Sequence, residues 1–181
     1  VYAYEAIRSP GFTTVSLVVV GDSGVLIADG QGSAEATARL LDDVRRLTAR
    51  PVRWVVIGSD HGDHTAGNHV IPGGVRWVVH PTSRAQLQRD SAASGARPVI
   101  VPPVAMASDH ETIDVGGTTV EVRFLGRAHT GGDLMVHLPR ERILFMSEAY
   151  LNRVFPAMRS AYPGEWVRVL DAALALPVDR F

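Results

Sequence analysis

The sequence has 181 residues, of which 46% are hydrophobic and 20% are charged, and its formal net charge is −1. These values are typical of one globular domain with a substantial core, and the near-neutral charge offers no basic surface for nucleic acid or an anionic membrane. The absence of cysteine excludes disulfides and thiolate metal ligands, and no apolar run reaches the roughly 18 residues of a membrane span. We therefore expect a single domain over residues 1–181.

The first half of the chain combines strands with helices. Two apolar, β-branched runs flank a Gly-Asp-Ser-Gly turn and predict a hairpin. Ser33 stands where the N-cap of the following helix belongs, and that helix has one apolar face. The strands predicted in this half are 13–20, 24–30, 52–58 and 75–80, and a second helix is predicted over 82–91.

The second half indicates another sheet. Gly116-Gly117 and the run Leu-Pro-Arg-Glu-Arg are typical of hairpin turns. A last helix is predicted to begin near Pro163, because proline suits the first helical turn. The strands predicted in this half are 98–101, 110–115, 118–125, 133–138 and 142–146. Two sheets packed face to face with helices outside form the layered α+β arrangement that this pattern favours.

Residues 55–69, VVIGSDHGDHTAGNH, combine histidines and aspartates directly after an apolar run. Alternate residues of an extended segment point the same way, so Ser59, His61 and Asp63 could converge on one side. His64 breaks that alternation, and one short loop could therefore present ligands to two different ions. Neutral imidazole and carboxylate suit zinc and other borderline divalent cations. Taken alone, the loop could also be a polar turn.

Two later segments place similar side chains at strand ends. LGRAHTGGDL (125–134) has His129 before a Gly-Gly turn, and RILFMSEAY (142–150) has Glu148 just after an apolar strand. Loops at one edge of a sandwich are where such groups could meet. A salt-bridged structural role is the alternative for Glu148.

These motifs resemble those of the metallo-β-lactamase-fold metalloproteins. The family signature is His-x-His-x-Asp-His after a strand, followed by Gly-x-x-His-Thr-x-Gly-Asp and a later acid after another strand. SDHGDHTAGN matches the first motif from His61 onward, and 126–134 matches the second nearly in full. LIADG (26–30) resembles the Asp-Gly element that ends the family's early strand. The resemblance implies a four-layer αβ/βα sandwich.

Three departures from the family pattern stand out. Ser59 replaces the first histidine of the motif, and Glu148 replaces the usual aspartate. A last histidine that the family carries near its C-terminus does not occur before Phe181. We expect that histidine, with the last strand and helix of the fold, to follow residue 181 in the native protein.

The resemblance implies a ligand set residue by residue. His61 and His129 would hold one ion, while Asp63 and His64 would hold a second ion with the later histidine. Glu148 would bridge the ions or bind one of them. The implied cofactor is Zn²⁺, one or two ions, with iron or manganese as other possibilities.

Other residues would support this set. Ser59 would be a weak, water-mediated or absent ligand, and Asp29 and Asp133 would hold the ligands in place from behind. The residues implied to act in catalysis are His61, Asp63 and His64.

The function implied is a metal-dependent hydrolase that uses a metal-bound hydroxide on a small ester, thioester, lactone or amide. Two alternatives stay open. One is an iron-dependent oxidoreductase on the same scaffold, since histidine and carboxylate ligands with open positions also suit non-haem iron. The other is a catalytically impaired protein that binds a small molecule. We expect a small-molecule substrate and neither nucleic acid nor a membrane as partner.

Overall fold

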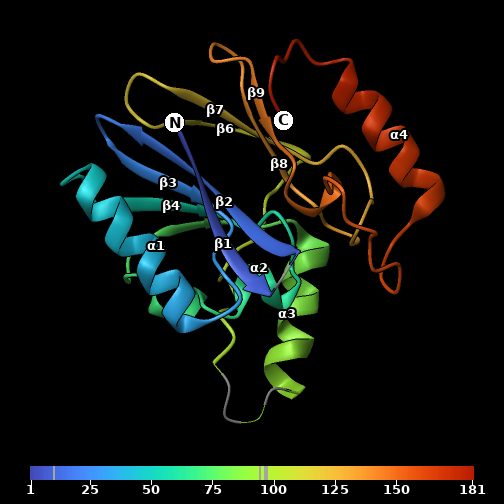
Figure 1. Ribbon diagram of the computed structural model, residues 1–181, viewed down its shortest axis with the longest axis horizontal. Coiled ribbons are helices and arrows are strands. Elements are labelled where there is room, and N and C mark those ends of the chain that lie inside the picture. Colours follow the sequence, from blue (N-terminus) through green and yellow to red (C-terminus); the bar gives the residue numbers. More distant parts are fainter. Residues whose placement is uncertain (10, 94, 96–97) are drawn as a thin grey trace.

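The computed structural model describes residues 1–9, 11–93, 95 and 98–181, and their strands form two sheets (Figure 1). The first sheet contains, in spatial order, β1 (Tyr2–Ser9), β2 (Phe12–Gly21), β3 (Gly24–Ala28), β4 (Val52–Val56) and β5 (Arg76–Val78). The second contains β6 (His110–Asp114), β7 (Thr119–Arg123), β8 (Met135–Leu138) and β9 (Ile143–Phe145). The helices are α1 (Ala34–Leu47), α2 (Gly62–Thr65), α3 (Pro81–Ala93) and α4 (Pro163–Leu174), with short 3₁₀ turns η1 (Asn68–Val70) and η2 (Ser147–Ala149).

Strand direction determines where polar loops gather. In the first sheet β1, β2 and β3 are antiparallel neighbours, whereas β3, β4 and β5 run parallel. The carboxyl ends of β3 and β4 therefore lie at the same edge of the sheet. Asp29 follows β3 at this edge, and the loop containing His61 follows β4. All neighbours in the second sheet are antiparallel.

The two sheets face each other across the main core. Leu26 and Val56 of the first sheet are fully buried with Val122 and Val136 of the second. The two hairpin turns also join the sheets, because the amide of Asp22 donates a hydrogen bond of 2.9 Å to the carbonyl of Gly116. These contacts fix the two sheets relative to each other. Loops from both sheets can therefore contribute to one site.

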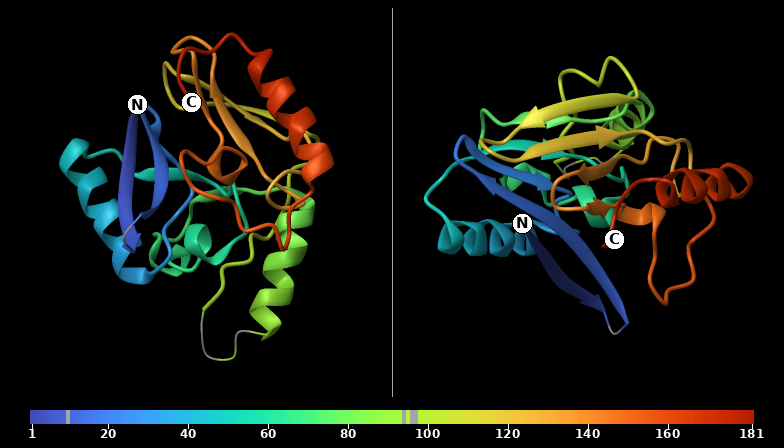
Figure 2. Two further views of the ribbon diagram at one scale, coloured as in Figure 1. Left: turned by 45° about the vertical axis from the view of Figure 1, so that its right-hand side comes forward. Right: turned by 90° about the horizontal axis from the view of Figure 1, so that it is seen from above.

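Helices cover the outer face of each sheet (Figure 1 and Figure 2). The amphipathic α1 packs Leu40 and Val44 against Ile27 of the first sheet. On the other side, α4 packs Trp166 and Val169 against the outer face of β8 and β9. The layers are helix, sheet, sheet and helix, which confirms the predicted four-layer αβ/βα sandwich. Ser33 is the N-cap of α1, as predicted, because its hydroxyl accepts a hydrogen bond of 3.1 Å from the amide of Ala36.

Two details differ from the expectations. β1 was not predicted, because most of its side chains are exposed and its sequence carries a weak alternation of apolar residues. The strand predicted over 98–101 is wrong, since these residues form no ladder. Val99 and Val101 are apolar because they pack beside Leu87 of α3, and the prolines that flank them provide no amide hydrogen for a ladder. None of the described helices combines the length and the apolar character that crossing a membrane demands.

Candidate metal centre

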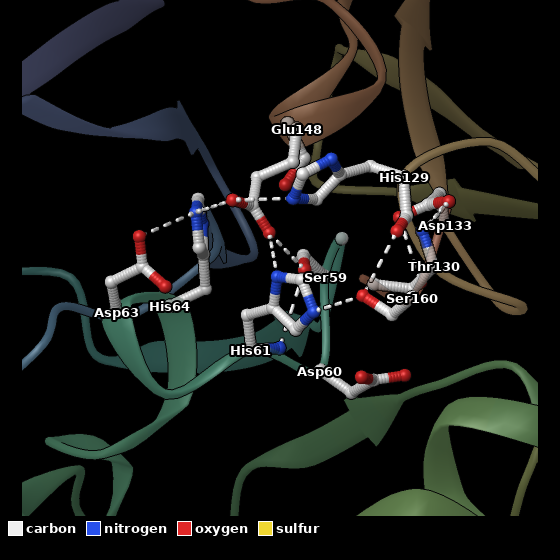
Figure 3. A network of polar contacts seen from close by, with 12 residues as sticks. Ser59, Asp60, His61, Asp63, His64, His129, Thr130, Asp133, Glu148 and Ser160 are labelled. Carbon is white, nitrogen blue, oxygen red and sulfur yellow. Dashed lines mark hydrogen bonds and ion pairs between the residues drawn. The ribbon is translucent and has the colours of Figure 1, made fainter. Parts of the chain in front are cut away.

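Three segments that are far apart in the sequence meet at one rim of the sandwich (Figure 3). The loop after β4 contributes His61 and His64, the loop before β8 contributes His129, and η2 contributes Glu148. The ring centroids of His61 and His129 are 4.9 Å apart. The imidazoles that sequence reasoning selected therefore face one small volume.

Glu148 lies at the centre of this volume. Its Oε2 atom is 2.8 Å from His61 Nδ1 and 2.6 Å from Ser59 Oγ, which donates a hydrogen bond to it. Its Oε1 atom is 3.3 Å from His129 Nε2 and 3.8 Å from His64 Nε2. One carboxylate thus contacts imidazoles on both sides, a span that depends on the length of the glutamate side chain.

The potential ligand atoms fall into two groups that share this carboxylate. His61, His129 and Glu148 form the first group, and Asp63, His64 and Glu148 form the second. Within each group the ligand atoms lie within 4.8 Å of one another. Ligand atoms about 2.0–2.2 Å from a tetrahedral zinc ion are about 3.3–3.6 Å apart, so small side-chain movements suffice for either group to close around an ion. The residues fit a divalent cation.

Asp29 holds the second group from behind. Its Oδ2 atom is 2.9 Å from His64 Nδ1, which leaves His64 Nε2 directed at Glu148. Its Oδ1 atom accepts a hydrogen bond of 2.6 Å from the amide of Gly58, where a Cβ atom would lie 2.7 Å from Ser147 Cβ. Ser147 Oγ also donates to Asp29 Oδ2 at 2.5 Å. Asp29 and Ser147 both have left-handed backbone conformations, a strain that is common at functional sites.

Asp63 reaches the site by a different route from the one expected. The extended segment ends at His61, and Asp63 and His64 lie in the single helical turn of α2. The expected alternation of 59, 61 and 63 is therefore wrong at Asp63, although its carboxylate still faces the second group at 3.8 Å from His64 Nε2. Arg8 of β1, which is half exposed, forms an ion pair with Asp63 Oδ2.

Ser59 is completely buried and supports Glu148. Its hydroxyl also accepts a hydrogen bond of 3.3 Å from the amide of His61. The carboxylate of Glu148 thus occupies the space in front of Ser59 where a larger ligand would lie. Ser59 thus supports the candidate ligand Glu148 through a hydrogen bond.

Asp133 holds a loop rather than an imidazole. Its carboxylate accepts hydrogen bonds from the amide and the hydroxyl of Thr130, at 2.7 and 2.8 Å, and one from the amide of Ala128. These contacts fix the turn that carries His129. Burial raises the pKa of Asp133 despite these bonds.

Charges at the centre shift the protonation of its members. Burial alone would lower the pKa of His64, but the carboxylates of Asp29, Glu148 and Asp63 outweigh it and raise that pKa to about 9. The hydrogen bond to Glu148 raises the pKa of His61 against a smaller effect of burial. Burial would raise the pKa of Glu148, yet the surrounding imidazoles hold it well below its usual range. Glu148 is therefore an ionised carboxylate beside two imidazoles, those of His61 and His64, whose pKa values are raised.

A cavity of about 1040 Å³ opens beside the two groups. Besides the candidate ligands, its lining contains both ends of the described chain and the segment between η2 and α4. Large apolar side chains are exposed around it, namely those of Tyr2, Phe12, Tyr150, Phe155 and Phe181. These side chains give the cavity an apolar wall beside the candidate ligands.

Sequence reasoning missed three contacts of the centre. Ser160 Oγ is 2.8 Å from His61 Nε2, Arg8 pairs with Asp63, and Ser147 bonds to Asp29. Single serines such as Ser147 in η2 and Ser160 in the segment before α4 carry no sequence pattern that would identify them. Arg8 lies on the strand that was not predicted.

The fold and the paired histidine and carboxylate groups define a class of α+β metalloproteins. The family model that matches residues 8–181 is that of the metallo-beta-lactamase superfamily, and the chain belongs to this superfamily.

Similar proteins agree with this assignment at the level of fold. The metallo-beta-lactamase from Pontibacter korlensis superimposes with a TM-score of 0.78 at 24% identity, over 94% of this chain and 78% of that one. The metallo-beta-lactamase IND-7 gives a TM-score of 0.80 at 17% identity, over 99% of this chain and 83% of that one.

The name of one curated relative indicates a different activity. It is the 2,4-dinitroanisole O-demethylase subunit alpha of Nocardioides sp. (strain JS1661), which is 26% identical over 137 residues. The matched region is 74% of this chain but 40% of that protein, so the chain spans well under half of the relative's length.

Proposed function

We propose that this protein is a metal-dependent hydrolase of a small ester, thioester, lactone or amide. The observation that carries the proposal is the sharing of one carboxylate, Glu148, by two groups of potential ligands. His61 and His129 bind a first ion, and Asp63 and His64 bind a second.

The ligand chemistry supports zinc as the cofactor, with one or two ions bound. Imidazole nitrogens and carboxylate oxygens are the donors that zinc takes in catalytic sites, which leave a position open for water or substrate. When bound, such ions lower the pKa of water and polarise a carbonyl oxygen.

The side chains of this protein then divide the remaining work. Glu148 holds the two groups together, and Asp29 keeps His64 Nε2 facing inward through its bond to Nδ1. Asp63, whose Oδ2 atom lies 3.8 Å from His64 Nε2 and pairs with Arg8, would hold the second ion together with His64. The apolar wall of the cavity binds the body of the substrate and excludes water from the reacting bond.

Metal analysis and turnover together test the proposal. Protein purified without added metal is analysed for zinc, iron and manganese, and is then assayed with chromogenic esters, thioesters, lactones and lactams before and after chelation. We expect about one or two zinc ions per chain and hydrolysis that a chelator abolishes and zinc restores. A protein that takes up no divalent ion, or hydrolysis that is indifferent to chelation, contradicts the proposal.

A matched pair of variants assigns the activity to the site. His129→Gln removes a candidate ligand from the first group, whereas His110→Gln makes the same change on an exposed residue outside both groups. We expect the first variant to lose metal and turnover and the second to keep both.

The second candidate function is a non-haem iron oxidoreductase. Two histidines and one carboxylate, as in His61, His129 and Glu148, also form the ligand set of many iron oxygenases. The name of the Nocardioides relative, an O-demethylase subunit, is a reason to test an aryl methyl ether as a substrate. Iron as the main bound metal, with oxygen consumed during turnover, would favour this function over hydrolysis.

A further inference from the structure

His61 presents a different nitrogen to the centre from its neighbours. His64 and His129 direct Nε2 toward Glu148, at 3.8 and 3.3 Å. His61 directs Nδ1, at 2.8 Å, so its Nε2 atom points away from the carboxylate. The orientation of this ring therefore depends on whatever contacts Nε2.

Ser160 is that contact. Its Oγ atom is 2.8 Å from His61 Nε2, and the same hydroxyl donates a hydrogen bond of 3.3 Å to the main-chain carbonyl of His129 (Figure 3). Ser160 lies between η2 and α4, in the segment that lines the cavity. A single hydroxyl thus connects the two histidines of the first group.

The chemistry of a hydroxyl suits this place. A nitrogen that binds a cation carries no proton, so a neutral imidazole that binds through Nδ1 has its proton on Nε2. Ser160 Oγ can accept that proton in a hydrogen bond while its own hydrogen is directed to the His129 carbonyl. The same geometry disfavours the ring flip that would turn Nε2 inward.

We propose that Ser160 is a positioning residue that fixes the tautomer and ring orientation in which His61 Nδ1 binds a divalent cation. The inference rests on the proposed function, because it concerns the first of the two ligand groups. Ser160 acts on His61 as Asp29 acts on His64, each from the side of the ring opposite to the centre. The partner of His61 is a neutral hydroxyl, whereas that of His64 is a buried carboxylate.

Zinc titration of the metal-free protein tests the inference. Zinc affinity is measured by calorimetry for the wild type, Ser160→Ala, Ser160→Thr and the control Ser108→Ala. Ser108 is exposed and also donates to a main-chain carbonyl, that of His110, but it lines neither the cavity nor the ligand groups. We expect Ser160→Ala to lower the affinity of one zinc site by about 10–100-fold, which is the usual cost of losing a residue that supports a ligand. The zinc affinities of the other two variants should stay near that of the wild type.

Nitrogen NMR of the histidine rings gives a readout that a merely structural role would not move. In the zinc-loaded wild type we expect the His61 spectrum to show zinc on Nδ1 and a proton on Nε2, and in Ser160→Ala we expect that signature to be lost or mixed. Zinc on Nε2 of His61 in the wild type would overturn the inference without any variant, even if Ser160→Ala failed to fold.

The outcomes separate the inference from the proposed function. A wild type that binds zinc, with Ser160→Ala of equal affinity and unchanged ring spectrum, overturns the role of Ser160 alone. A wild type that binds no divalent cation overturns both.

Discussion

Glu148→Gln is the most revealing single change, because it keeps the size of the side chain and removes its charge. The carboxylate contacts Ser59 Oγ at 2.6 Å, His61 Nδ1 at 2.8 Å and His129 Nε2 at 3.3 Å, and it belongs to both ligand groups. The neutral amide of Glu148→Gln should therefore lower the affinity of the centre for every ion that it holds.

The size of the effect follows from the number of ligands. Losing a residue that merely supports a ligand costs about 10–100-fold in metal affinity, and Glu148 is one of only three ligand residues in each described group. We expect a loss of at least about 100-fold, or about 2.8 kcal/mol of binding free energy. At a zinc concentration that is 100 times the wild-type Kd, the variant loses most of a zinc-dependent stabilisation of about 2.7 kcal/mol.

Thermal unfolding with and without zinc measures this difference. Glu35→Gln is the control, because it makes the same chemical change in an exposed i,i+4 pair with Arg39 on α1. We expect zinc to raise the Tm of the wild type and of the control but barely that of Glu148→Gln. An equal rise in all three proteins would refute the role of Glu148 as a shared ligand.

Three further changes test the surroundings of the centre. The pKa of His64 is raised to about 9, so this group stabilises the metal-free protein most below pH 6.5. The free energy of unfolding should fall by up to about 3 kcal/mol as the pH rises through 9, which urea unfolding across this range would show. In Asp29→Asn the free energy of unfolding should depend less on pH, because the partner of His64 Nδ1 has lost its charge. Arg8→Gln removes a half-exposed cation that competes with zinc for the carboxylate of Asp63, so the zinc affinity measured by titration should rise by up to about fivefold. A lower zinc affinity would instead assign Arg8 a supporting role. Ser59→His should overpack the buried site and lower the free energy of unfolding, measured in urea, by about 1–3 kcal/mol. Adding the shorter side chain of Glu148→Asp should restore part of that loss. A Ser59→His variant as stable as the wild type would show that the site has room for the imidazole.

Local patterns predicted much of the fold. The hairpin of β2 and β3 follows from two apolar runs around a two-residue turn, and α1 follows from its N-cap Ser33 and one apolar face. β1 was missed because its partly exposed residues alternate weakly, and its place is determined by pairing with β2. The apolar run 98–101 misled for the opposite reason, since its burial comes from packing beside α3.

The candidate ligands were predictable because they occur in motifs, and their supports were not. His61, His64 and His129 stand at fixed spacings after strands, and the structure brings them together. The hydroxyl of Ser160 reaches His61 from a residue 99 positions away, through a segment without regular structure. Contacts of this kind depend on the tertiary arrangement of loops, which leaves no periodic signal in the sequence.

Anomalous scattering at the zinc edge, from crystals of the zinc-loaded protein, tests the central claim most directly. We expect a peak bonded to His61 Nδ1 and His129 Nε2, and a second peak, where a second ion is bound, beside Asp63 and His64, with Glu148 in contact with both. Zinc bound elsewhere, with these side chains hydrogen-bonded only to one another, would contradict the assignment of this rim of the sandwich as a metal centre.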